Sequence, residues 1–161
     1  IDEEAARELI KPAMRAVDLG AAPGGWSWQL VQRGMLVTAV DNGPMQDALM
    51  ASGMVEHLRT DAFTWMPDSS VDWLVCDMAE RPLHVTRLVA RWFTSRKCHI
   101  SIFNLKLPMT KRYQAVKECL QYLDRALEDA DMPHMIEARQ LYHDREEITV
   151  FCRRITPESA D

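Results

Sequence analysis

Charged side chains stand at the ends of several short apolar segments of this 161-residue chain. Four carboxylates and one lysine occupy such positions: Asp18, Asp41, Asp61, Asp77 and Lys106. A fold does not need these ions, because gathering like charges in one crevice costs stability. The pattern therefore indicates a binding site with carboxylate acceptors and a lysine that is suited to acid–base chemistry.

Asp77 and Lys106 are the pair that could do chemistry on a substrate. Lys106 follows the apolar segment 99–105, and a partly dry crevice disfavours its charged form, so we expect a lowered pKa. A nearby carboxylate opposes that shift and orients the ammonium group. Lys106 is thus a candidate base for a hydroxyl group. The structural alternative is an ion pair, which would contribute little stability at a solvated edge.

A glycine-containing segment reads as a strand, a tight turn and the start of a helix: Val17-Asp18-Leu19-Gly20-Ala21-Ala22-Pro23-Gly24-Gly25-Trp26. Gly20 lets a ligand approach the backbone, and N–H groups at a helix start can receive a carboxylate. The spacing Gly-x-x-x-Gly-Gly departs from the nicotinamide-dinucleotide fingerprint. The turn alone does not identify its ligand, but together with the Asp77–Lys106 pair it leads us to expect S-adenosylmethionine, which carries an adenosine and a carboxylate. The expected contact residues are Gly20, Ala22, Pro23, Gly24, Gly25 and Trp26.

Asp41, Asp61 and Asp77 complete the expected cofactor site. Asp41 follows the second apolar strand and could accept hydrogen bonds from both ribose hydroxyls of an adenosine. Nicotinamide and S-adenosylmethionine sites share this feature, so it does not choose between them. Asp61 could accept a hydrogen bond from the adenine amino group, and its structural alternative is a turn cap.

The elements that must position these residues alternate between strand and helix. We expect strands at 15–19, 35–40, 55–59, 71–76, 99–105, 135–139 and 148–154. We expect helices at 2–9, 26–33, 45–51, 83–93 and 111–129. This alternation predicts an α/β fold of the Rossmann-like class, a mostly parallel sheet with helices on both faces. The last two strands leave no room for a helix between them, so the final hairpin adds one reversed strand.

Composition narrows the class of protein. No apolar run approaches the roughly 18 residues of a membrane span. The four cysteines are scattered without zinc-ligand spacing, which fits a reduced, cytoplasmic setting, and we expect no metal. The net charge is −5, yet the segment from Glu80 to Arg112 holds eight bases and one acid. Such a stretch suits an anionic partner, although Arg87 and Arg91 read better as a solvated helix face.

The charged and glycine-containing segments together resemble the FtsJ-like 2′-O-ribose RNA methyltransferases. The segments are Asp18 to Trp26, Cys76-Asp77-Met78, Asn104-Leu105-Lys106 and Arg145-Glu146. Three longer segments are similar in particular to bacterial members that methylate a cytidine ribose of 23S ribosomal RNA: 40–45, 104–109 and 141–147. The resemblance implies a class I methyltransferase domain over residues 1–161 that uses S-adenosylmethionine and no metal.

The same resemblance implies roles for individual residues. The family uses a Lys-Asp-Lys-Glu set, in which Asp77, Lys106 and Glu146 match the last three members. Lys11 matches a different, non-catalytic lysine. We therefore expect the first lysine and an RNA-binding part to precede residue 1 in a longer protein. We also expect four bases to contact RNA phosphates: Arg81, Lys111, Arg112 and Arg145.

Three other classes of function remain open from the sequence. A nicotinamide-dependent oxidoreductase shares the glycine turn and Asp41, but the glycine spacing and Lys106 argue against it. A non-catalytic RNA-binding or assembly module that keeps the fold would suit the acidic body of the chain and the unmatched first lysine. A small-molecule methyltransferase would not need the basic stretch.

Overall fold

The computed structural model of the chain describes residues 8–140 and 146–156. The expected first helix, 2–9, and Arg145 therefore lie largely or wholly outside the described residues. The remaining expected elements are all found, with bounds that differ by a few residues at most.

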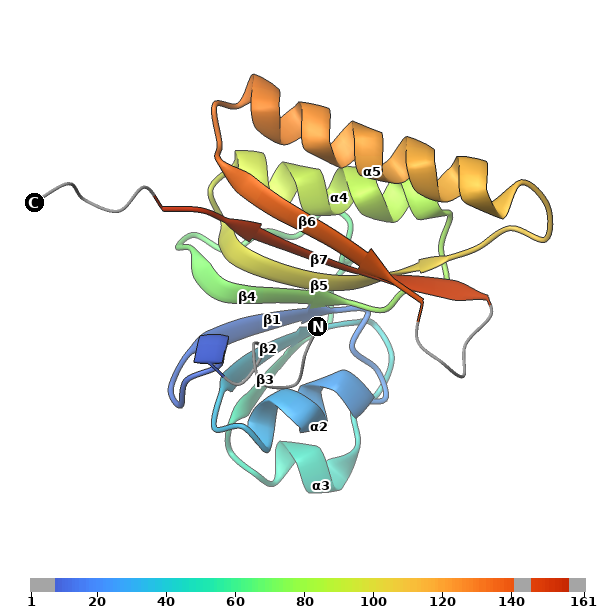
Figure 1. Ribbon diagram of the computed structural model, residues 1–161. Helices are drawn as coiled ribbons and strands as arrows, with labels where there is room; N and C mark the ends of the chain where they lie inside the picture. Colours follow the sequence, from blue (N-terminus) through green and yellow to red (C-terminus); the bar gives the residue numbers. More distant parts are fainter. Residues whose placement is uncertain (1–7, 141–145, 157–161) are drawn as a thin grey trace, which may run out of the picture.

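One seven-stranded sheet organises the molecule, in the order β3-β2-β1-β4-β5-β7-β6 (Figure 1). β7 pairs antiparallel with both β5 and β6, and the pairs among the first five strands are parallel. The fold prediction, a parallel sheet with one reversed strand, is therefore confirmed. The strands are β1 (Arg15–Leu19), β2 (Leu36–Val40), β3 (Val55–Leu58), β4 (Val71–Cys76), β5 (Cys98–Lys106), β6 (His134–Arg139) and β7 (Glu147–Arg154).

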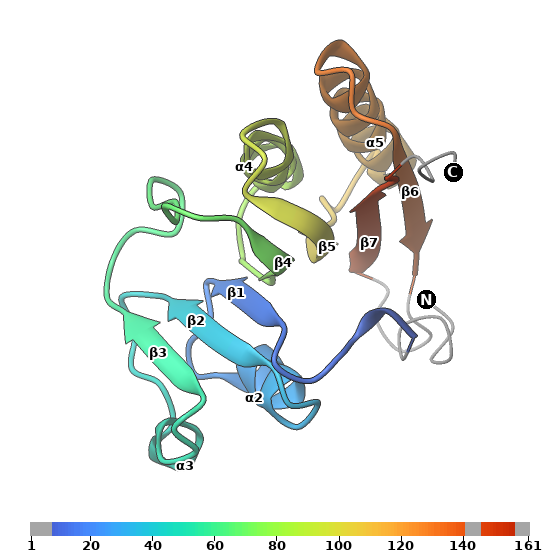
Figure 2. The same cartoon turned by 90° about the vertical axis from the view of Figure 1, so that its left-hand side faces the viewer.

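Helices cover the two faces of the sheet. Helices α4 (Pro82–Thr94) and α5 (Arg112–Asp129) lie on one face, and α2 (Gly25–Val31) and α3 (Asp47–Met50) lie on the other (Figures 1 and 2). α4 begins with a proline at its first turn, which suits Pro because its missing N–H is unneeded there. Its buried Val85, Leu88, Val89 and Trp92 recur at helical spacing, so one stripe packs on the sheet.

Side chains alternate between the two faces along each strand. Val17 and Leu19 of β1 pack in the core under α4 and α5, whereas Ala16 packs in the core under α2. Asp18 therefore points to the α2 face, where it meets Ser27. The same alternation places Trp73 and Val75 of β4 on the α2 face.

The carboxyl ends of the parallel strands meet at the right-hand edge of the sheet in Figure 1. We call this the carboxyl edge. Because β7 runs antiparallel to β5, its first residue, Glu147, lies opposite Lys106, the last residue of β5. The sheet thus brings together residues from β1, β2, β4, β5 and β7 at one edge, where open α/β sheets bind ligands. Within the described ranges, no helix combines the length and apolar character needed to cross a bilayer.

Candidate active site

The turn after β1 depends on two glycines. Gly20 has a φ of +74° and Gly24 a φ of +122°, conformations that L-residues rarely adopt. Space is also limiting, because a Cβ on Gly20 would lie 2.3 Å from Met78 Cγ and one on Gly24 would lie 2.4 Å from Leu49 Cδ2. The protein's own packing therefore requires these two glycines.

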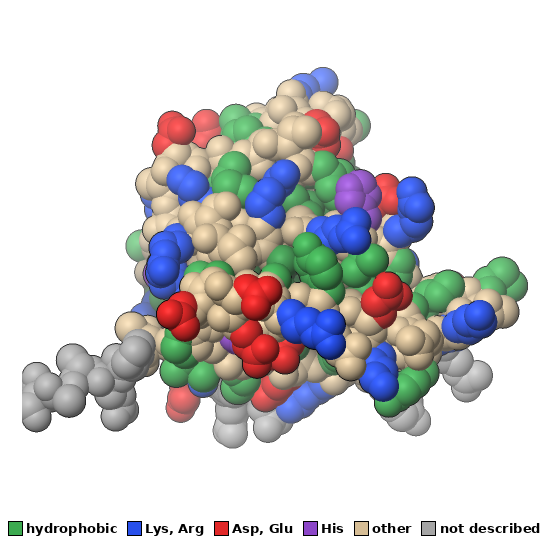
Figure 3. Space-filling view, turned by 90° about the horizontal axis from the view of Figure 1, so that it is seen from above, with side chains coloured by type: hydrophobic (Ala, Val, Ile, Leu, Met, Phe, Trp, Pro, Cys, Tyr) green, Lys and Arg blue, Asp and Glu red, His purple; other side chains and the backbone are tan. Residues whose placement is uncertain are grey.

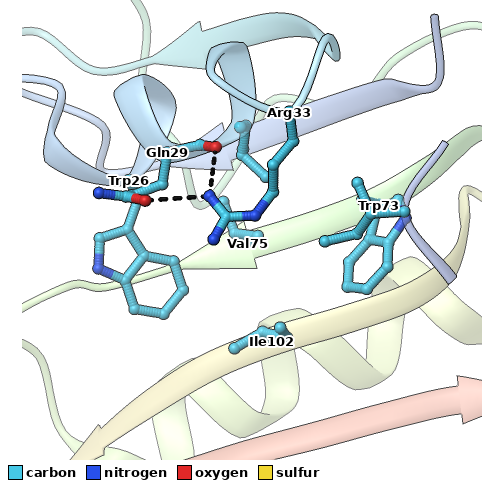
Figure 4. A pocket seen from close by; sticks show the side chains of 8 residues that line it. Trp26, Gln29, Arg33, Trp73, Val75 and Ile102 are labelled. Atoms are coloured by element: carbon cyan, nitrogen blue, oxygen red, sulfur yellow. Dashed lines mark hydrogen bonds between the residues drawn. The ribbon is translucent and has the colours of Figure 1, made fainter. Parts of the chain in front are cut away.

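Gly25, Pro23 and Trp26 differ in their surroundings. A Cβ on Gly25 would have no atom within 4 Å, so open space lies beside its backbone. Pro23 is also exposed. The Trp26 side chain instead lines a pocket of about 270 Å³ between α2 and the sheet, together with Trp73, Val75 and other apolar residues (Figure 4). Space for a ligand is thus found at the turn's backbone, and the Trp26 ring faces the sheet.

Asp41 ties the second strand end to the glycine turn. Its Oδ2 accepts a hydrogen bond from the Ala22 N–H at 3.0 Å, and its Oδ1 accepts one from the Gly43 N–H at 2.7 Å. Each carboxylate oxygen has two lone pairs, so these bonds leave acceptor capacity for ligand hydroxyls. The half-buried carboxylate is therefore oriented beside the turn, and its contact with a ribose stays a prediction.

Asp61 caps a turn after β3. Its Oδ1 accepts from the Phe63 N–H at 2.9 Å, and its backbone carbonyl accepts from Trp65 N at 3.0 Å. This is the structural alternative considered for the residue. Asp61 is exposed, and its proposed contact with adenine stays a prediction.

Lys106 lies at the centre of a polar cluster at the carboxyl edge. Its Nζ donates hydrogen bonds to Asp77 Oδ1, at 2.9 Å, and to Glu147 Oε2. The Lys106 side chain is 39% exposed, and that of Glu147 only 12%. A hydroxyl group arriving here would therefore meet a cationic donor and two carboxylate acceptors.

The pKa of Lys106 differs from the expectation. Burial lowers it, but hydrogen bonds and charges from Glu147 and Asp77 outweigh burial and raise the pKa above the usual value of lysine. The prediction of a lowered pKa was wrong, because two carboxylates rather than one surround the amine. Lys106 is thus a cation in the protein alone.

The glutamate of the cluster is Glu147, whereas the sequence reading named Glu146. Glu146 is exposed, and its backbone carbonyl accepts a hydrogen bond from the Leu107 N–H at 2.7 Å. Glu147 is the first residue of β7 and pairs with Lys106, the last residue of β5, so the two side chains lie on the same face of the sheet. The structure places Glu147 there.

Asp18 is a buried carboxylate on the α2 face of the sheet. It is 1% exposed, and its Oδ2 accepts a hydrogen bond from the Ser27 hydroxyl at 2.7 Å. Burial raises the pKa of Asp18 to about 7, with a smaller contribution from the charges of Asp77 and Asp41. This link joins β1 to the first turn of α2 and so fixes the glycine turn between them.

The expected RNA-contacting bases are spread around the edge. Lys111 and Arg112 stand at the start of α5, five and six residues after Lys106, and Arg81 precedes α4. Arg145 lies outside the described residues. On the face covered by α4 and α5, basic side chains are intermixed with acidic and hydrophobic ones and form no continuous patch (Figure 3).

Besides Glu147, sequence reasoning missed Asn104, Thr149 and Tyr113. Asn104 is 4% exposed on β5 and contacts both carboxylates, and Thr149 of β7 donates to Asn104. A polar residue inside an apolar strand, two positions before Lys106, was the available signal. Tyr113, 80% exposed in the first turn of α5, was hidden because the sequence does not reveal exposure.

Comparison with known proteins gives a consistent result. Residues 1–128 match the family model of the FtsJ-like methyltransferases. The chain is 51% identical, over 94% of its length, to ribosomal RNA large subunit methyltransferase M from Azoarcus sp. strain BH72. It is 53% identical, over 93% of its length, to the protein of the same name from Chromohalobacter salexigens.

The chain spans about two-fifths of these relatives, 41% and 42% of their respective lengths. Among solved structures, it is similar to the 23S rRNA methyltransferase ErmE, with a TM-score of 0.66 and 14% identity. That match covers 97% of this chain and 69% of ErmE. At such low identity the likeness concerns the fold.

Proposed function

The chain belongs to the FtsJ-like methyltransferase family, and we propose that it transfers a methyl group from S-adenosylmethionine to a cytidine ribose 2′-hydroxyl of 23S ribosomal RNA. Two relatives that are 51% and 53% identical over the aligned residues are named ribosomal RNA large subunit methyltransferase M, which supports ribosomal RNA as the substrate. The observation that carries the proposal is Lys106 held between the carboxylates of Asp77 and Glu147 at the carboxyl edge.

The residues at the first two strand ends fit S-adenosylmethionine. Asp41 retains acceptor capacity for the ribose hydroxyls, and the open space beside Gly25 admits a ligand to the backbone of the turn. Asp61 is the proposed acceptor for the adenine amino group. When bound, the cofactor supplies an electrophilic methyl group on a sulfonium.

The ammonium of Lys106 orients the ribose 2′-hydroxyl and stabilises negative charge that develops on its oxygen. A raised pKa favours the protonated form of Lys106 in the protein alone, and we propose that its ammonium, rather than the free amine, meets the hydroxyl group. The hydroxyl proton leaves toward the carboxylates of Asp77 and Glu147 as the oxygen–carbon bond forms and the sulfur–carbon bond breaks. Much of the rate enhancement then comes from positioning.

RNA approaches over the segment that follows Lys106. Between α5 and β7 lies a pocket of about 530 Å³, which Arg112, Tyr113 and Ile148 help to line. This volume falls in the usual range of ligand pockets, about 300–1,000 Å³. Lys111 and Arg112 provide positive charge, and the exposed ring of Tyr113 offers a surface on which an unpaired base can stack.

The chemistry of the product tests the proposal. The protein is incubated with S-adenosylmethionine labelled in its methyl group and with unmethylated 23S ribosomal RNA, and the RNA is then hydrolysed with alkali. A 2′-O-methyl group blocks cleavage at its own nucleotide, so we expect label in an alkali-resistant dinucleotide that contains cytidine. Label in single nucleotides would indicate base methylation and overturn the proposal, as would the absence of any transfer.

A further inference from the structure

Asn104 joins the two carboxylates that hold Lys106. Its Nδ2 donates hydrogen bonds to Asp77 Oδ1 at 3.2 Å and to Glu147 Oε1 at 3.1 Å. Asn104 and Lys106 are two residues apart on β5 and therefore project from the same face of the sheet. One neutral amide thus contacts both carboxylates from the buried side, while the Lys106 ammonium contacts both from the exposed side.

Thr149 determines which way the Asn104 amide points. Its hydroxyl donates to Asn104 Oδ1 at 2.8 Å, and the two residues are direct partners across the β5–β7 pair. A flipped amide would set its oxygen against two carboxylate oxygens, which also only accept hydrogen bonds. The threonine on one side and the carboxylates on the other therefore favour the same orientation.

We propose that Asn104, oriented by Thr149, is a positioning residue that fixes the Asp77 and Glu147 carboxylates around Lys106 without adding charge. This inference rests on the proposed function, because those three groups are the proposed reaction centre. An aspartate is nearly the same size as asparagine but would add a third carboxylate at this point. The neutrality of Asn104 thus limits how strongly the cluster holds the proton of Lys106.

The charged groups that face this cluster come from several strands. Asp77 follows β4, Lys106 ends β5 and Glu147 begins β7. Asp18 of β1 lies on the same face and interacts electrostatically with Asp77 and Asp41. An added carboxylate at position 104 would join these negative charges and would favour the charged form of Lys106.

Kinetics of substituted enzymes test the positioning role. We expect Asn104→Ala to lower kcat by about 10- to 100-fold, since misplaced reacting groups cost rates of this order. The KM values for RNA and S-adenosylmethionine should stay within about threefold of wild type, because Asn104 contacts neither in the proposed arrangement. Thr149→Val should lower kcat by about fivefold, and Thr149→Ser, which keeps the hydroxyl, should restore it.

The pH profile separates positioning from simple structural support. Wild-type kcat should not fall as the pH rises toward the ordinary pKa of lysine, because the raised pKa of Lys106 keeps it charged there. Asn104→Asp should move the acidic limb of the kcat profile to higher pH by about one unit, because the added negative charge opposes ionisation of the neighbouring carboxyl groups. Ser101→Ala is the matched control, a buried polar residue of β5 on the opposite face, and should leave kcat and the profile unchanged.

A titration that does not depend on turnover completes the test. With lysine labelled for NMR, the titration midpoint of Lys106 should rise in Asn104→Asp and stay unchanged in Ser101→Ala. An unchanged midpoint in Asn104→Asp overturns the inference even where the protein transfers no methyl group. Wild-type kcat and an unshifted pH profile in both Asn104 variants of an active enzyme would overturn it as well.

Discussion

At the scale of single residues, the two consecutive glutamates at the start of β7 mark the limit of sequence reasoning. The resemblance at Arg145-Glu146 predicted that Glu146 would join Lys106, whereas in the structure Glu147 contacts the lysine. Which of the two faces the lysine depends on strand register, since a shift of one residue moves a side chain to the other face. Register against β5 is set by tertiary pairing, so the choice of Glu147 required the structure.

Asp77 and Lys106 were easier to predict as a pair. Each stands at the end of an apolar strand, and neighbouring parallel strands end at the same edge of a sheet. The direction of the Lys106 pKa shift was not accessible, because it depends on how many carboxylates surround the amine. Asn104 and Glu147 are the neighbours that the sequence reading left out.

Asp18 gives a prediction about stability. Burial raises its pKa in the folded protein to about 7 from the ordinary 3.8. Between these values the folded state holds a proton that the unfolded state has released, so raising the pH favours unfolding, by at most about 1.4 kcal/mol per pH unit. We expect Asp18→Asn to remove this pH dependence. The free energy of unfolding of the variant, relative to wild type, should therefore increase from about pH 4 to about pH 7.

Chemical denaturation at a series of pH values measures this difference. Asp47→Asn serves as the control, because Asp47 lies in the exposed first turn of α3. A stability difference between Asp18→Asn and wild type that does not change with pH would show that Asp18 is ionised in the folded protein.

At the scale of elements, periodicity predicted the helices and strands well. The alternation of short apolar runs with amphipathic segments was sufficient, because each strand packs a buried face and each long helix a buried stripe. The stripe of α5, with Leu123 and Leu127 buried, follows this pattern. Surface features of the same helix, including the exposure of Tyr113, depend on neighbouring loops and were not predictable.

The start of α5 supports a prediction about RNA binding. Tyr113 is 80% exposed and helps to line the pocket between α5 and β7. Because stacking of a base on an aromatic ring contributes about 1–3 kcal/mol, Tyr113→Ala should raise the Kd for single-stranded RNA by about tenfold. Affinity for S-adenosylmethionine should not change, and calorimetry measures both.

Tyr122 provides a matched control on the same helix. It is also an exposed tyrosine, but Arg87 covers its ring at 5.5 Å and it lies two and a half turns farther along α5. Tyr122→Ala should leave RNA affinity at the wild-type value. Equal losses in the two variants would show that the pocket at the start of α5 is not the place where RNA binds.

At the scale of the whole molecule, the sheet order decides what meets at the carboxyl edge. Placing β7 between β5 and β6 sets Glu147 opposite Lys106, although 41 residues separate them in the chain. The fold class and the reversed final strand were predictable from the lack of room for a crossover helix. The order of β6 and β7 was not, because a hairpin can add either of its strands to a sheet edge.

The distribution of charge belongs to the same scale. The basic stretch of the sequence suggested an anionic partner, whereas on the face covered by α4 and α5 basic side chains are mixed with acidic ones. The chain spans about two-fifths of its curated relatives.

The neighbouring glutamates provide the most direct test of the central claim that Lys106, Asp77 and Glu147 form the reaction centre. Each glutamate is replaced by glutamine, and single-turnover methyl transfer to 23S ribosomal RNA is measured with saturating S-adenosylmethionine. Glu147→Gln should slow transfer by about 100-fold or more, because it removes a charge that holds Lys106 and accepts the hydroxyl proton. Glu146→Gln should stay within about threefold of wild type, as expected for an exposed charge. The reverse order, or equal rates in the two variants, would contradict the account.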